Sequence, residues 1–162
     1  MATWSQFVTA VPHLASQVRG FFEPVGQSLG YLATVRPDGG PRVHPVMPLV
    51  TDEGLFCFVV RSPKRRDLER DGRYALHALP GESGDHEAYL AGTAAAVTDL
   101  RRVDRLARVF RAAPDRDWML FELRVDVAMV GRAGLAYEIW HSPGPLPQPR
   151  GLACTSPPGQ VQ

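Results

Sequence analysis

Apolar residues recur at two different spacings along the chain, and the change of spacing separates a helical beginning from an extended remainder. Thr3 is suited to cap a short first helix. Pro12 is suited to the first turn of a second helix, which Pro24 would end. The apolar positions at helical spacing are Leu14, Val18, Phe21 and Phe22. This pattern predicts two consecutive helices, the second of which buries one face.

From Gly30 onward, apolar and β-branched residues form short runs between turn sequences, which is typical of antiparallel strands. Pro-Asp-Gly-Gly at 37–40 and Thr-Asp-Glu-Gly at 51–54 predict hairpin turns. Pro45 and Pro48 favour an edge strand or a bulge, since proline cannot donate to a sheet. The runs expected as strands are 30–36, 42–50, 55–60, 73–79, 86–99 (bent at Gly92) and 118–132, with a possible short addition at 135–141.

Two further helices are expected between these strands. Ser62 and Pro63 predict a helix start, and Gly72 predicts its end. Asp99 is suited to cap a second helix over 100–113, whose apolar residues share one face. Six or seven antiparallel strands with short helices favour a small closed or partly closed barrel. No Gly-x-Gly-x-x-Gly sequence follows a strand, so a dinucleotide site of that type is not expected.

Composition agrees with one ordinary globular domain. The chain has 162 residues, 44% of them apolar and 22% charged, with a net charge of +1. These values exclude a disordered chain. We expect one domain over 1–141, beginning with the helical segment 1–28, and a Pro/Gly-rich tail over 142–162.

The same composition narrows the cellular setting. We expect no membrane span, because no stretch of about 18 apolar residues exists. The first residues lack the features of an export signal, so a cytoplasmic location is expected. Cys57 and Cys154 form neither a disulfide framework nor a metal cluster. An oligonucleotide-binding barrel is disfavoured by the near-zero net charge, and no nucleic-acid partner is expected.

One lysine, Lys64, stands among 18 basic residues, and it lies in the basic segment 61–73. Four basic side chains (Arg61, Lys64, Arg65 and Arg66) lie at the start of the helix expected there. A helix start has unpaired N–H groups and a positive dipole end, so it favours anions and disfavours cations. A solvated helix with surface ion pairs is the alternative, but cations at this end cost stability unless an anion offsets them. We therefore favour a phosphate site that includes the Ser62 hydroxyl.

Arg42 and His44 share one face of the 42–50 strand because side chains alternate along a strand. If that strand neighbours the 55–60 strand, Arg42 can approach the same anion site. An exposed arginine in a turn is the equally plausible alternative.

Several segments in order resemble the pyridoxamine 5′-phosphate oxidase-like split-barrel family, which includes FMN-binding and deazaflavin (F420)-binding proteins. The segments are ATVRPDGGPRVHPV, RSPKRRDLERDGRYALH and EAYLAGTA, and the resemblance covers about residues 28–100, with weaker agreement through Trp140. It implies a mainly β fold, a six-stranded antiparallel Greek-key split β-barrel with short flanking helices. It also implies a homodimer with cofactor sites at the interface.

The resemblance assigns cofactor contacts to particular positions. The second strand would line the ring and supply a basic residue to the phosphate, and the start of the 62–71 helix would bind that phosphate. Glu87 stands where the family often has glutamine. The implied cofactor-binding residues are Arg42, Val43, His44, Val59, Val60, Arg61, Ser62, Lys64, Arg65 and Trp140.

The expected activity is hydride transfer between FMN or F420 and a small organic substrate, with chemistry carried by the cofactor. No catalytic residue is assigned; by residue type, His44 and His77 are the best proton donors, although His77 is also typical of a packed strand. The alternative is a non-catalytic flavin or haem carrier or sensor of the same fold. Pyridoxamine phosphate is not the expected substrate, because the C-terminal aromatic-basic end of the oxidases is matched only loosely by Trp140 and His141.

Overall fold

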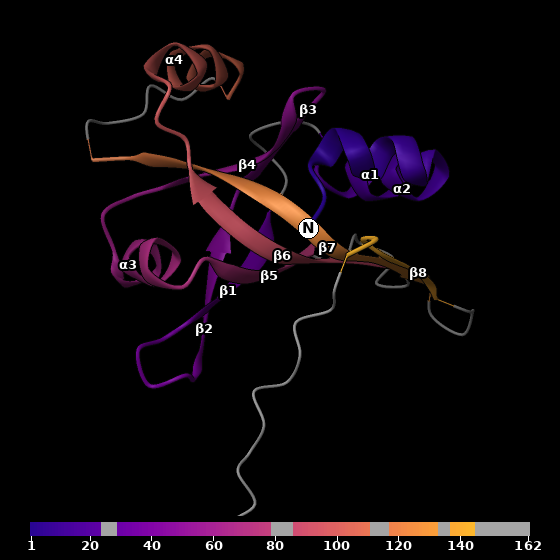
Figure 1. Cartoon of the computed structure of the whole chain (residues 1–162), viewed down its shortest axis with the longest axis horizontal. Helices are drawn as coiled ribbons and strands as arrows, with labels where there is room; N and C mark the ends of the chain where they lie inside the picture. Colours follow the sequence, from indigo (N-terminus) through magenta and orange to yellow (C-terminus); the bar gives the residue numbers. More distant parts are fainter. Residues whose placement is uncertain (24–28, 79–85, 111–116, 133–136, 145–162) are drawn as a thin grey trace, which may run out of the picture.

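In a computed structural model, the described residues of the chain form an antiparallel β structure with four short helices (Figure 1). The structure describes residues 1–23, 29–78, 86–110, 117–132 and 137–144. The strands are β1 Gly30–Val35, β2 Pro41–Val46, β3 Pro48–Thr51, β4 Gly54–Val59, β5 Arg73–Ala78, β6 His86–Ala96, β7 Met119–Arg132 and β8 Glu138–His141. The helices are α1 Trp4–Ala10, α2 Pro12–Phe21, α3 Pro63–Arg70 and α4 Leu100–Val109.

All eight strands belong to one sheet in the order β2-β1-β5-β6-β7-β4-β3, with β8 paired to β7. The strands β2 and β3 are the two ends of this order, yet only Met47 separates them along the chain. The sheet therefore curls until its two edges meet at Met47, which gives a split half-barrel. The mainly β split-barrel expectation is confirmed.

The expected count of six strands is wrong for the described residues, where eight are present. The expected strand 42–50 is two strands because Pro45 and Pro48 flank a change of partner at Met47. Its first part pairs with β1 and its second part with β4. The expected proximity of 42–50 to the 55–60 strand thus holds for β3 only, and Arg42 lies on the other edge of the sheet. The edge position expected from the prolines is confirmed.

Glycine shapes the fold at two positions. Gly72 follows α3 with a φ of 75°, a left-handed conformation that ends the helix. The register between β6 and β7 shifts between Ala91 and Gly92, which confirms the expected bend. A Cβ on Gly92 would lie 2.0 Å from the carbonyl oxygen of Arg124, so the backbones approach too closely for a side chain.

The main core lies between the concave face of the sheet and the two N-terminal helices. Thr3 caps α1, with its hydroxyl accepting from the Gln6 N–H, and Pro12 occupies the first turn of α2, both as expected. Figure 1 shows α1 and α2 together at one side of the sheet and α3 near β1 and β2 at another. The large buried side chains of this N-terminal segment are Trp4, Phe7, Leu14, Val18 and Phe22, and α3 adds Leu68.

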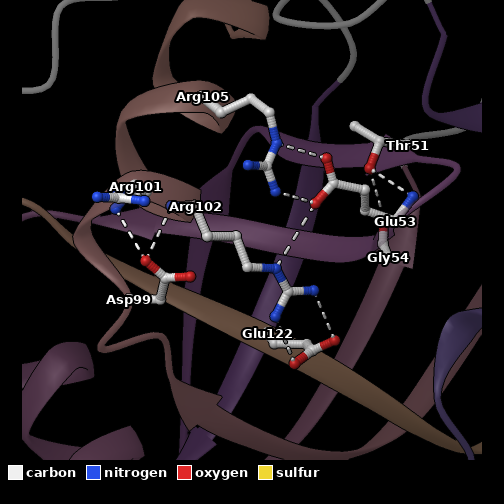
Figure 2. Close-up of polar contacts among 8 residues, drawn as sticks. All are labelled: Thr51, Glu53, Gly54, Asp99, Arg101, Arg102, Arg105 and Glu122. Carbon is white, nitrogen blue, oxygen red and sulfur yellow. Dashed lines mark hydrogen bonds and ion pairs between the residues drawn. The ribbon is translucent and has the colours of Figure 1, made fainter.

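The helix α4 covers a second, smaller core against β3, β4 and the start of β7. This core contains Leu49, Phe56, Phe58, Leu106, Ala107, Phe110 and Leu120. Asp99 caps α4 by accepting from two N–H groups of its first turn. Arg102 and Arg105 extend from α4 to Glu53 and Glu122 (Figure 2). The charged face of α4 therefore includes ion pairs that join it to the sheet, in addition to solvated residues.

Within the described ranges, no helix is long and apolar enough to cross a membrane. The expected end of the helix over 100–113 lies outside the described residues from position 111 onward, as does the tail beyond Gly144.

Candidate basic site at the start of helix α3

The start of α3 follows directly from β4 through Val60, Arg61 and Ser62. Ser62 occupies the cap position with extended backbone, but its hydroxyl donates to the carbonyl of Val60 at 2.9 Å and makes no capping hydrogen bond. The expected side-chain cap is therefore wrong. The first turn holds no acidic residue. Its N–H groups, at the positive end of the helix dipole, have no side-chain acceptor among the described residues, which suits an added anion.

The basic residues of this segment divide into two groups. Lys64 is half-buried, and its Nζ donates to the carbonyl of Pro45 on β2 at 3.4 Å. Arg65 instead binds Glu69 at 3.1 Å and the carbonyl of Asp117 at 3.0 Å. Arg61 and Arg66 are exposed. Lys64 thus bridges α3 and the edge strand β2, whereas Arg65 is engaged with acceptors elsewhere.

Arg42 reaches α3 from β2 through a buried carboxylate. Its Nε donates to Asp67 Oδ2 at 2.7 Å, and the Asp67 side chain is 3% exposed. Thr34 donates to the same oxygen and Arg70 to the other. Burial alone would raise the pKa of Asp67, but hydrogen bonds from Arg42, Thr34 and Arg70 outweigh it and lower that pKa. Asp67 therefore stays ionised.

The charges of the segment 61–73 predict that its acids pair with Arg70 and Arg73, and this reasoning missed the place of Asp67 in the site. The pairs Asp67–Arg70 and Asp71–Arg73 do form. Asp67 and Leu68 are the buried residues of α3, and this burial is set by the strands packed against the helix, so the local sequence held no signal for it.

His44 lies on the same half-buried face of β2 as Arg42, as expected. Its Nε2 is buried and has no hydrogen-bond partner among the described residues. Burial lowers the pKa of His44, and the charges of Lys64 and Arg42 lower it further, against the opposing effect of Asp67. A buried polar atom without a partner costs free energy, so this ring nitrogen favours a ligand that supplies one.

The other residues predicted to bind the cofactor lie on or beside β2, β4 and β8. Val43 points to the opposite face of β2 and is 57% exposed. The Val59 side chain is in the core, and Val60 is 41% exposed. Trp140 on β8 packs against Phe7 of α1, with ring centroids 4.9 Å apart. Within one chain, Trp140 therefore belongs to the N-terminal helical side and not to the start of α3.

The outer face of the sheet carries the other histidine singled out by its residue type. His77 Nε2 lies 3.0 Å from Glu87 Oε2, and both side chains are more than one third exposed. His77 is thus partly accessible and paired, not packed in the core. Cys57, in contrast, is a fully buried thiol whose pKa is raised to about 12 by burial, so it acts as a small apolar core residue.

A cavity of about 620 Å³ is bordered by β5, β6 and β7 and lies away from the basic site. Its lining includes Tyr74, Gly92, Asp126 and His141. None of the predicted phosphate contacts borders it.

The curled antiparallel sheet and the basic start of α3 define a split-barrel protein. The sequence model described as Pyridoxamine 5'-phosphate oxidase matches residues 14–128, and the chain belongs to that family. A search of curated protein sequences finds no match.

Solved structures support the same fold. A haem-binding protein from Mycobacterium smegmatis has a TM-score of 0.65 at 20% identity, over 80% of this chain and 58% of that one. The chain thus spans little more than half of that protein. A protein from Clostridium acetobutylicum related to general stress protein 26 has a TM-score of 0.59 at 14% identity, over 85% and 96% of the two chains. HutZ, the haem storage protein of Vibrio cholerae, has a TM-score of 0.52 at 19% identity, over 69% and 89%. Identities this low show the fold alone.

Proposed function

We propose that the protein binds a phosphate-bearing flavin or deazaflavin, FMN or F420, and uses it as a cytoplasmic oxidoreductase on a small organic substrate. The observation that carries this proposal is the convergence of three groups on one place. Lys64 bridges α3 and β2, Arg42 approaches from β2, and the buried Nε2 of His44 lies within electrostatic reach of both. The first turn of α3 adds N–H groups that have no side-chain acceptor in the described part of the chain.

These residues fit the phosphate of such a cofactor. Lysine supplies a point charge, and arginine supplies a planar fork suited to phosphate oxygens. His44 would donate through Nε2 in the tautomer that carries its proton there. The cofactor, when bound, supplies hydride transfer. The chain would then orient the ring and exclude water, and no side chain of the described residues is assigned as a general acid or base.

The choice between FMN and F420 depends on charge beside the phosphate site. F420 carries an acidic polyglutamyl tail. Arg61 and Arg66 are exposed next to the first turn of α3 and would suit that tail. Arg65 would contribute less to binding that tail than its position suggested, because its guanidinium already donates to Glu69 and to the carbonyl of Asp117.

A haem or flavin carrier is the second candidate, and one feature of the site favours it. Burial and two cations lower the pKa of His44, which favours the neutral imidazole, and a neutral ring nitrogen without a partner among the described residues is suited to bind a metal. The same cations could pair with carboxylate groups of haem. The names of the M. smegmatis and V. cholerae proteins agree with this candidate.

We also propose that two copies of the chain associate through the outer face of the sheet. Strand pairing aligns the outward side chains in rows across β2, β1, β5, β6, β7 and β8. One row contains Val43, Ala33, Ala75, Ala91 and Val127, and the next contains Tyr31, His77, Tyr89, Met129 and Ile139.

Three large members of these rows are about half exposed, at 47% for Tyr31, 57% for Val43 and 54% for Ile139. A mostly apolar face of this extent favours a partner, and a second copy of the chain is the partner that the family resemblance implies.

The test begins with the absorption spectrum of freshly purified protein, followed by titration with FMN, F420 and haemin. Tight binding of FMN or F420, with hydride transfer to an acceptor, supports the oxidoreductase. Binding without turnover, or a haem spectrum only, supports the carrier. Lys64→Ala should weaken the binding of the cofactor. Arg66→Ala is the control and should change the FMN affinity little, since Arg66 is exposed on the same helix. If none of the three ligands binds, the proposed function is wrong.

A further inference from the structure

The two polar side chains buried in the described part of the chain bind one another. Thr34 on β1 and Asp67 on α3 are each 2% exposed. Thr34 Oγ1 donates to Asp67 Oδ2 at 3.0 Å, and the same oxygen accepts from Arg42 Nε at 2.7 Å. Arg70 Nη1 donates to Asp67 Oδ1 at 3.2 Å. A buried carboxylate is costly unless it is paired, and donors from β1, β2 and α3 satisfy this one.

The two arginines at this carboxylate are not equivalent. Arg70 uses Nη1 for Asp67 and Nη2 for the carbonyl of Val35, so both of its terminal nitrogens are engaged. Arg42 uses only Nε, and its Nη1 and Nη2 have no partner within the described ranges. The Arg42 side chain is 28% exposed. Asp67 therefore fixes the Arg42 guanidinium at one edge and leaves the other edge available.

Stability alone is a weak reason for this arrangement. Buried ion pairs can often be replaced by apolar residues without loss of stability, because removing charges from water costs as much as the pairing gains. A guanidinium fixed in advance, however, loses less side-chain freedom when it binds an anion.

We propose that Asp67 is a positioning residue of the anion site, which orients Arg42 so that Nη1 and Nη2 meet the phosphate of the bound cofactor. This inference rests on the proposed function for the identity of the ligand, but requires only that an anion binds beside Arg42 and Lys64.

The proposal predicts a change of affinity opposite in sign to the prediction from charge alone. The negative charge of Asp67 repels an anion, so removing it would strengthen anion binding if charge alone mattered. Positioning predicts weaker binding, because Arg42 would lose its fixed orientation. The direction of the change therefore distinguishes the two explanations.

The experiment compares Asp67→Ala and Asp67→Asn with Asp71→Asn as a matched control. Asp71 lies just after α3 and pairs with Arg73, which is not part of the site. Calorimetric titrations use FMN and inorganic pyrophosphate, at a temperature where circular dichroism shows every variant folded. Asp67→Ala should weaken the binding of both ligands by about tenfold, because one charged hydrogen bond is lost. Asp67→Asn should lose less, since an amide oxygen can still accept from Arg42, and Asp71→Asn should match the wild type.

The same substitutions are repeated in an Arg42→Ala background. If Asp67 acts through Arg42, Asp67→Asn should cause no further loss there, whereas a general structural role would weaken binding equally in both backgrounds. Tighter or unchanged binding by Asp67→Ala, or an equal loss without Arg42, overturns the proposal. Wild-type protein that binds pyrophosphate but neither FMN nor F420 refutes the proposed cofactors while Asp67 is still tested with pyrophosphate. Wild-type protein that binds no anionic probe refutes both.

Discussion

Arg102 is expected to contribute most of the ion-pair energy that joins α4 to the sheet. Its guanidinium donates to the two oxygens of Glu122 at 3.2 and 3.3 Å and lies 3.7 Å from Glu53 (Figure 2). It also covers the ring of Phe56, 4.9 Å from the centroid. The side chains of Arg102 and Glu122 are 26% and 20% exposed. They are therefore less screened by water than an ordinary surface pair.

Arg102→Ala should lower the free energy of unfolding by about 2 kcal/mol. A hydrogen bond to a charged group contributes about 1.5–3 kcal/mol when largely covered, and this one is reduced by its partial exposure. The contact with Phe56 adds about 0.5–1 kcal/mol. In a double-mutant cycle with Glu122→Gln, the coupling should be about 1 kcal/mol.

Urea unfolding followed by tryptophan fluorescence measures these quantities, and Trp118 beside the second core reports on this region. The matched comparison is the pair Arg105–Glu53, whose contacts are shorter at 2.7 and 2.8 Å but whose arginine is 55% exposed. We expect a clearly smaller coupling for that pair, because solvent screens it. If the Arg105–Glu53 coupling equals or exceeds that of Arg102–Glu122, contact distance and not burial determines the stabilisation, and the reasoning is refuted.

Three further predictions concern the site and the sheet. Lys64→Ala should weaken binding of the phosphate-bearing cofactor by about 1–3 kcal/mol, and unchanged affinity in a titration would remove Lys64 from the site. Gly92→Ala should destabilise the protein by about 1–3 kcal/mol because its Cβ would meet a backbone oxygen, whereas Gly20→Ala, with open space on α2, should be neutral or stabilising in thermal unfolding. The lowered pKa of His44 means that the unfolded chain takes up its proton first, so stability should fall as the pH drops below the ordinary value of 6.5, and His44→Gln should reduce that slope in urea unfolding at pH 5.5–7.5.

The types of single residues were sufficient to predict where helices begin and end and where one strand bends. The caps at Thr3 and Asp99, the helix end at Gly72 and the bend at Gly92 follow from residue types at single positions. Pro45 correctly indicated an edge strand, because a missing N–H is tolerated where no partner strand is present.

The same reasoning could not predict which strands pair with one another in the sheet. The break at Met47 sends β2 and β3 to opposite edges, and no local pattern shows which strand each run will join. The Ser62 hydroxyl turned back to Val60 instead of capping α3, since both contacts are available to a serine at that position.

The sequence by itself determined a basic helix start that holds the single lysine of the chain, and the resemblance it carries led to the family that residues 14–128 match. Only the tertiary structure decided how the basic residues differ. It buried Asp67 between β1, β2 and α3, bound Arg42 to it, directed Arg65 to other acceptors, and left His44 Nε2 without a partner among the described residues. The physical reason is that charge is visible in a sequence, whereas the desolvation and pairing that fix each charge arise only when distant strands and helices meet.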